Sequence, residues 1–465
     1  MDRRDFIRMT LASGLLHSAG VLPAVAAPAK GGFPTVGHRV LAKLMLPGGP
    51  DMRHIIVPPY EAGAQTYGYN YWQARARAHG IADTASAWQQ RWNNDFTAFS
   101  HGATQFGIHN DCGWLQQLWQ DGKLAIVSNV YGGSSRDHAN CIDIIEQGVQ
   151  SFAPNEPYRA GWGGRLADIA GGPVASLTVS PRTFCYGPAT SGTATYGTGN
   201  IVSAANVRAM TLYRNPEAEW PLTERAVITR GVQSYYAAKG QEMDPDSLYS
   251  RFTEMEQTLR AFGEPIDERL ASLPLPPAIE ALQYGGSNES NFGQQVANVH
   301  DVFATFDILS PRVVSLEYSG SWDSHSGQRE AVEPLFADLF GSGRTLDVMF
   351  SELPPNALDN LVLVIAGEFG RQLRDNGDNG TDHGEGNCML VIGNNVAGGV
   401  YGDLFPEAEL ERLNDDSPQI EGLTAIDHLF GAVCDWVSPG SGNGVFPERA
   451  GAPLESGVSF DGLLV

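Results

Sequence analysis

Short apolar runs, each bounded by turn-forming residues, are the clearest pattern along this chain. They are Val40–Leu46, Leu124–Val127, Arg312–Glu317, Leu361–Ile365 and Met389–Ile392. Runs of this length and β-branched content are typical of strands buried on both faces, as in the centre of a parallel sheet. The pattern therefore predicts a central sheet assembled from segments far apart in the sequence.

Helical patterns separate these runs. Apolar residues recur at helical spacing in 112–122, from about 139 onward, in 161–169 and in 423–436. The aromatic-rich stretch 60–107 places Trp88, Trp92, Phe96 and Phe99 at helical spacing, which indicates core-facing helix. Strands alternating with helices predict an α/β fold. We expect a single domain over residues 28–465, with residues 184–304 forming a loop and a helical cap.

The first 27 residues do not fit that fold. Arg3 and Arg4 precede a modestly apolar stretch that ends in the small residues Ala24-Val25-Ala26, as in a twin-arginine export signal. We therefore expect export to the periplasm or beyond, and no later segment has the apolar length of a membrane span. The alternative is an ordinary N-terminal helix that carries two arginines.

The formal net charge of −23 limits the possible partners. A surface so acidic argues against nucleic acid and against anionic membranes. An anionic substrate would need local positive charge or a metal. The five cysteines include no Cys-x-x-Cys pair, so neither a zinc ribbon nor a redox dithiol is expected.

Polar residues able to bind a ligand cluster where the apolar runs end. The richest stretch, 360–393, places Glu368 and Arg371 just after one predicted strand and Asp382-His383 just before another. Ligands of α/β sheets bind beyond the carboxyl ends of the strands, so this stretch predicts a site. A solvated surface loop is the alternative.

Other strand ends add to this set. Asp51 follows the first strand through a Gly-Gly turn, and Asp323 and His325 lie two residues apart, where both can reach one cation. Arg136-Asp137-His138 follows a glycine-serine turn at a predicted helix start, where Asp137 could serve as the N-cap. Carboxylates and imidazoles in this mixture suit Zn²⁺, Mn²⁺, Mg²⁺ or Ca²⁺. Asp427-His428 lies within an apolar helical pattern and is interpreted as structural.

These motifs resemble a family of twin-arginine-exported proteins known as domain of unknown function 1501, in the alkaline phosphatase/sulfatase-like superfamily. The resemblance rests on Gly48-Gly49-x-Asp51, Arg136-x-His138, Trp322-Asp323-x-His325, Glu368-Phe369-Gly370-Arg371 and Asp382-His383-Gly384. It implies a three-layer α/β/α sandwich with a mainly parallel sheet. It also implies a divalent-metal shell made of Asp51, Asp323, His325, Glu368, Asp382 and His383.

The resemblance suggests an exported metal-dependent hydrolase that acts on a phosphate or sulfate ester, either small or part of a polysaccharide. Arg136 and Arg371 would bind the anion, and Asp137 or His138 would orient or deprotonate the attacking water. The family often has Arg-Ser-His where this chain has Arg136-Asp137-His138, so a hydroxyl nucleophile is missing there. The alternative is a non-catalytic metal-containing protein that binds a polysaccharide or a partner protein.

Overall fold

The computed structural model describes residues 37–148, 161–171, 174–176, 201–203, 206–209, 265–283, 287–413, 415–416 and 418–465, together with isolated positions between 227 and 263. The export signal and much of the expected cap lie outside the described residues. Both stay predictions, as does the single-domain organisation. In the part of the chain that is described, no helix combines the length and apolar character needed to cross a bilayer.

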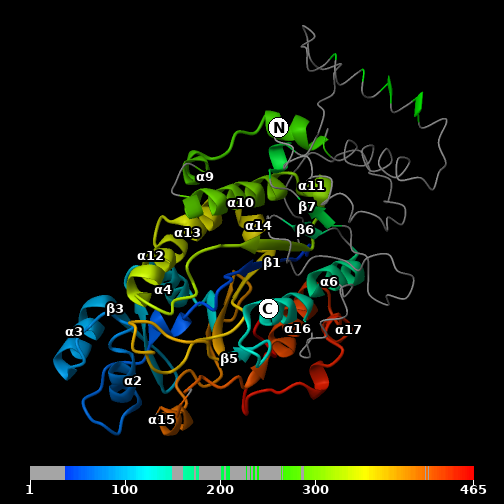
Figure 1. Ribbon diagram of the computed structural model, residues 1–465. Helices are drawn as coiled ribbons and strands as arrows, with labels where there is room; N and C mark the ends of the chain where they lie inside the picture. The colour runs from blue at the N-terminus through cyan, green and yellow to red at the C-terminus, as the bar shows by residue number, and fades with distance from the viewer. Residues whose placement is uncertain are drawn as a thin grey trace.

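A nine-stranded sheet forms the centre of the molecule (Figure 1). Its strands run in the order β11 (Gly399–Tyr401), β5 (Leu124–Tyr131), β10 (Asn387–Ile392), β9 (Leu361–Ala366), β1 (Val40–Met45), β8 (Val313–Glu317), β6 (Val174–Ser176) and β7 (Ile201–Ser203). The short strand β12 (Thr424–Ala425) also pairs with β5. The strands β1, β9 and β10 are buried along their whole length, which is why they read as continuous apolar runs.

The sheet is mixed but mostly parallel, which confirms the predicted fold class. Among the described strands of this sheet, only β10 runs antiparallel to its two neighbours, β5 and β9. Apolar runs report burial and not direction, so the sequence could not reveal this reversal. The reversal matters for the site, because the residues that precede β10 lie at the same sheet edge as the residues that follow β9.

Helices cover both faces of the sheet, and each face has its own hydrophobic core. One core packs the sheet against helices on one side: α4 (Gly113–Gln120), α9 (Pro277–Leu282), α10 (Ser287–Ala304), α11 (Phe306–Leu309), α12 (Gln328–Phe340), α13 (Thr345–Glu352) and α14 (Pro355–Leu358). The other core lies against α5 (His138–Gln147), α6 (Trp162–Ala170), α16 (Ile426–Val437) and α17 (Gly442–Val445). Alternate residues of β1, such as Leu41 and Ala42, point into different cores.

A small antiparallel sheet lies beside this sandwich. It consists of β2 (Ile56–Val57), β4 (Thr104–His109) and β3 (Phe96–His101), next to α2 (Tyr67–Arg75) and α3 (Ala85–Asp95). The prediction that Phe96 and Phe99 continue a helix is wrong, because α3 ends at Asp95 and both residues lie on β3. Phe96 still stacks on Trp92, so contact at this spacing did not require helix.

Short elements complete the described chain. The helix α15 (Ala408–Arg412) and the 3-10 helices Met52–His54, Val207–Ala209 and Arg449–Gly451 lie in connecting segments. The four described cysteines, Cys112, Cys141, Cys388 and Cys434, are buried free thiols.

Candidate metal centre

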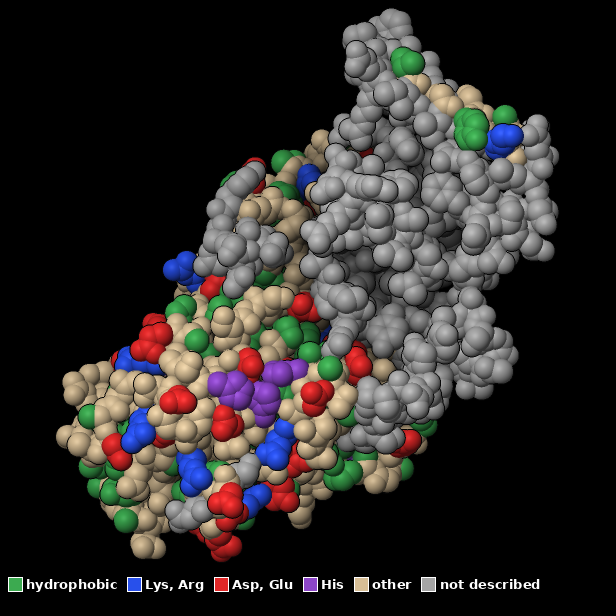
Figure 2. Space-filling view, viewed as in Figure 1, with side chains coloured by type: hydrophobic (Ala, Val, Ile, Leu, Met, Phe, Trp, Pro, Cys, Tyr) green, Lys and Arg blue, Asp and Glu red, His purple; other side chains and the backbone are tan. Residues whose placement is uncertain are grey.

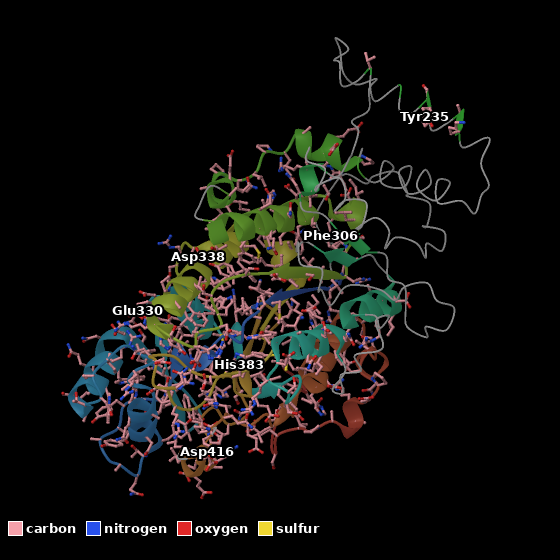
Figure 3. The ribbon with its side chains drawn as sticks, viewed as in Figure 1. Tyr235, Phe306, Glu330, Asp338, His383 and Asp416 are labelled. Carbon is pink, nitrogen blue, oxygen red and sulfur yellow. The ribbon has the colours of Figure 1, made fainter. Side chains whose placement is uncertain are left out.

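Loops that follow β5, β8 and β9 meet the loop that precedes β10 at one edge of the central sheet. The segment after Arg371 turns back so that Arg371 bridges His383 in antiparallel fashion, and the amide N–H of Gln372 donates to the carbonyl of Asp382 at 3.0 Å. This pairing carries Asp382 and His383 to the end of β9. Figure 3 labels His383 close to the central strands, and Figure 2 shows histidine side chains gathered on the surface of this face.

Arg371 fixes these loops in place. Its fully buried guanidinium donates to the carbonyls of Gly48 at 2.6 Å, Gly49 at 2.8 Å, Trp322 at 3.1 Å and Thr381 at 3.0 Å, and to Oδ1 of Asp323 at 2.7 Å. The sequence analysis predicted that Arg371 binds a substrate anion. In the structure its donors are occupied by the protein, so it joins three strand-end loops and orients Asp323.

The Gly48-Gly49 turn packs closely against Trp322, Asp323 and Phe369, where a side chain would clash. Both residues have positive φ, and a Cβ on Gly49 would lie 2.3 Å from the ring of Phe369. The amide N–H of Gly48 also donates to Oε1 of Glu368 at 2.8 Å. The glycine pair therefore serves this site more directly than Asp51, which follows it.

The side chains of His138, Asp323 and His383 converge at the surface of the cluster, and His325 lies beside the last two. Nε2 of His383 and Nε2 of His325 lie 3.0 Å apart, and each is 3.0 Å from Oδ1 of Asp323. Nε2 of His138 lies 3.4 Å from Oδ2 of the same carboxylate. His138, Asp323 and His383 form a compact group whose ligand atoms lie within 4.8 Å of one another.

The hydrogen-bond partners of the three Nδ1 atoms show that the Nε2 atoms present lone pairs to the cluster. Nδ1 of His138 lies 2.7 Å from a carboxylate oxygen of Glu368, and Nδ1 of His325 lies 2.9 Å from one of Asp382. Nδ1 of His383 lies 2.9 Å from the backbone carbonyl of Arg136, which can only accept. Each Nδ1 therefore carries the proton, and in the neutral rings each Nε2 presents a lone pair.

This arrangement fits a metal ion. Donor atoms around a tetrahedral zinc lie about 3.3 Å apart, given bonds of about 2.0 Å, and the observed spacings of 3.0–3.4 Å match that value. Metal-binding histidines ordinarily donate their other N–H to a carboxylate or a carbonyl, as all three do here. A single proton could bridge only one pair of these ligand atoms, whereas a metal ion between them could bind several of them at once.

The electrostatics of Asp323 suit the same role. Burial raises its pKa, but the hydrogen bond and positive charge of Arg371 act the other way, and the net pKa is lowered to about 2. The hydrogen bond to Glu368 raises the pKa of His138, with partial burial opposing it. Asp323 is thus ionised at neutral pH, and its side chain remains 44% exposed.

Glu368 lies behind His138 and is fully buried. Its Oε1 accepts from both Gly48 and His138, whereas its Oε2 is buried without a hydrogen-bond partner among the described residues. A buried carboxylate that is only partly satisfied is stabilised by a nearby cation. Asp382 plays the matching part for His325, and Asn376 donates to Asp382 at 3.0 Å, which lowers the pKa of that carboxyl.

Replacing Glu368 by Gln should weaken metal binding by about 10- to 100-fold, the usual effect of changing a partner that orients a ligand. The amide keeps the shape of the side chain but loses the charge that makes His138 a better donor. Competition with a chromophoric chelator measures the affinity. Glu385→Gln is the matched control, because Glu385 accepts from the amide of Gly422 and not from a histidine. Equal affinities for the two variants would contradict this role of Glu368.

The loop before α5 has a strained backbone and positions His138, the first residue of that helix. Arg136 has a φ of 55°, an uncommon value for a residue other than glycine, and its carbonyl meets His383. Asp137 is the N-cap of α5, with Oδ1 accepting from the amide of Asn140 at 2.9 Å. The N-cap alternative for Asp137 is therefore observed, and its carboxylate is exposed beside His138.

Asp51 lies apart from the four donors. It is buried and pairs with Arg75, and it accepts from the side-chain amide of Gln328 at 2.8 Å. Burial raises the pKa of Asp51, but the charges of Arg75 and His54 outweigh it, so the net pKa is lowered. The structure thus brings together five of the six residues expected to surround a metal, with Glu368 and Asp382 behind the histidines.

A second group of possible metal ligands, His54, His79 and Glu333, was not found from the sequence. Its members lie in segments without a shared local motif, so only the fold reveals them. Glu333 already contacts Arg91 and lies 3.4 Å from Arg329. Burial raises its pKa, but the hydrogen bond and charge of His54 and the charge of Arg91 outweigh burial and lower the pKa to about 2. His54 contacts Gln328 at Nδ1 and Glu333 at Nε2. His79 contacts the hydroxyl of Tyr71 at Nε2, and its Nδ1 is buried without a hydrogen-bond partner among the described residues.

Comparison with known proteins gives one finding. Residues 308–417 match the family described as Protein of unknown function (DUF1501). The matched segment contains Asp323, His325, Glu368, Asp382 and His383, but neither Asp51 nor His138. No curated protein and no solved structure matches the chain.

Proposed function

We propose that this protein is a metal-dependent hydrolase that acts on a phosphate or sulfate ester, with His138, His325, His383 and Asp323 holding the metal. One observation carries the proposal: ligand atoms of His138, Asp323 and His383 lie within 4.8 Å of one another, with Nε2 of His325 3.0 Å from the last two, and an acceptor holds each imidazole from behind. Imidazole-rich sets suit zinc and other borderline metals better than Mg²⁺ or Ca²⁺, which prefer oxygen ligands.

A divalent metal at this place would polarise the ester oxygen and favour deprotonation of water. The chain's own residues hold the donors in register: Glu368, Asp382 and the carbonyl of Arg136 fix the three rings, and Arg371 fixes Asp323. In the hydrolysis, water oxygen bonds to phosphorus or sulfur and the bond to the alcohol oxygen breaks. The proton that water loses ends on the departing alcohol.

The test is an ester panel assayed with metal-loaded and metal-free protein. We expect hydrolysis of at least one phospho- or sulfoester by the zinc-loaded form and none by the metal-free form. Hydrolysis that survives complete removal of metal would overturn the proposal, as would a fully loaded protein that cleaves no ester.

Asp137 is the proposed proton acceptor, because it is exposed and precedes His138. Asp137→Asn keeps a good N-cap and removes the base, so stability should hold while turnover falls at unchanged metal content. Asp137→Ala removes the cap as well and should cost about 1 kcal/mol of stability. Urea denaturation and steady-state kinetics separate the two effects. Normal turnover in Asp137→Asn would limit Asp137 to capping.

A second function is favoured by a different observation. Arg371 is buried among carbonyls and Asp137 caps a helix, so two of the expected catalytic side chains have structural contacts. This suits a non-catalytic metal protein that binds a polysaccharide or a partner protein through the same exposed face. Metal binding without hydrolysis would select this function. In either case the twin-arginine pattern of residues 1–27 supports a periplasmic or secreted location.

A further inference from the structure

The charges of the side chains fixed around the candidate metal centre sum to −2, which a divalent metal would cancel. Three carboxylates lie at the cluster or directly behind its histidines, those of Asp323, Glu368 and Asp382. Arg371 contributes one positive charge through its contact with Asp323. Arg136 and Asp137 are consecutive residues of opposite formal charge, so together they add nothing to this sum. With a divalent metal the sum is therefore zero.

A neutral site gives a doubly charged anion little electrostatic advantage. The protein as a whole carries a formal charge of −23, and this field opposes a dianion about twice as strongly as a monoanion. The guanidinium of Arg371 is fully buried and donates to backbone carbonyls. It therefore does not offer its hydrogen bonds to the free oxygens of a phosphoryl group.

The exposure of the donors points the same way. The side chains of Asp323 and His325 are 44% and 45% exposed, whereas that of His383 is 22% exposed, so the centre is most open on the side of His325. A diester needs space on both sides of the phosphorus atom, and an open face provides it.

Building on the function proposed above, we propose that this centre selects singly charged tetrahedral esters over doubly charged phosphate monoesters. Phosphodiesters and sulfate monoesters share this chemistry. Hydrolysis of bis(p-nitrophenyl) phosphate and of p-nitrophenyl sulfate distinguishes the two sources, with p-nitrophenyl phosphate as the dianionic reference.

Asp382 offers a direct test of the charge argument. Asp382→Asn retains an oxygen that can accept from Nδ1 of His325, but it removes one negative charge beside the site. Asp378→Asn is the matched control, because Asp378 is an exposed acid of the same loop and is not a partner of the three histidines.

The experiment uses cobalt-loaded full-length protein and two related probes. Methylphosphonate is the dianion, studied at a pH above its second ionisation, and methyl methylphosphonate is the monoanion. Shifts in the visible spectrum of cobalt report binding of each anion without any turnover. Comparison of the ratio of the two dissociation constants between each variant and wild type cancels the intrinsic preference of the metal.

Relative to wild type, Asp382→Asn should move this ratio toward the dianion by about three- to tenfold, the range for one partly solvated charge at short distance. Asp378→Asn should move it by less than about twofold. An unchanged ratio in Asp382→Asn, or cobalt-loaded protein that binds neither anion, overturns the inference and leaves the metal centre standing. Wild-type protein that binds no cobalt overturns the metal centre and the inference together.

Discussion

The His383→Ala variant should fold normally and lose its metal. Nε2 of His383 is 3.0 Å from both His325 and Asp323, so its removal takes away a central donor and not a supporting contact. The loss of affinity should exceed the about 10- to 100-fold typical of a supporting partner. Elemental analysis after gel filtration gives the metal content, and circular dichroism gives the fold.

A second histidine provides the control for this variant. His101 is exposed on β3, where its Nδ1 accepts from the amide of Val400. His101→Ala should retain the wild-type metal content. Stoichiometric metal in His383→Ala would exclude His383 from the centre, and equal losses in the two variants would show that metal binds histidines indiscriminately.

The Asp51→Asn variant should lose much stability and no metal. Arg75 is buried and relies on Asp51 for its compensating charge, and removal of one partner of a buried ion pair typically costs about 3–5 kcal/mol. The pKa of Asp51 is lowered in the folded state, so its contribution is complete at neutral pH and declines as the pH falls through the folded-state pKa. Urea denaturation measures the free energy of unfolding.

The comparison for Asp51 is an exposed carboxylate. Asp121→Asn changes an exposed acid that accepts from Gln117, and it should alter stability by less than about 0.5 kcal/mol. Should Asp51→Asn keep its stability and lose metal instead, Asp51 would be a metal ligand, as the superfamily resemblance implies.

The sequence predicted the sheet because strands buried on both faces must consist of apolar residues, and such runs can be recognised locally. β1 and β9 are enclosed by a core on each face, so every position had to be apolar apart from Lys43, whose ammonium contacts Glu146 at 2.6 Å. The direction of β10 cannot be recognised in this way, since an apolar run reads the same whichever way it pairs.

The sequence predicted which residues make up the candidate site better than it predicted the role of each one. Asp323 and His325 lie close in sequence after a strand, and their shared reach toward one cation follows from local geometry. The role of Arg371 depends on carbonyls more than 300 residues away, at Gly48 and Gly49. The pairing of Asp51 with Arg75 likewise joins a strand end to a helix, and no spacing rule predicts it.

Anomalous diffraction from crystals of zinc-loaded protein, measured at the zinc absorption edge, tests the central claim most directly. We expect one strong peak between His138, His325, His383 and Asp323, about 2.0–2.1 Å from the histidine nitrogens. A peak beside Asp51 or among His54, His79 and Glu333, with none at the four converging donors, would contradict it.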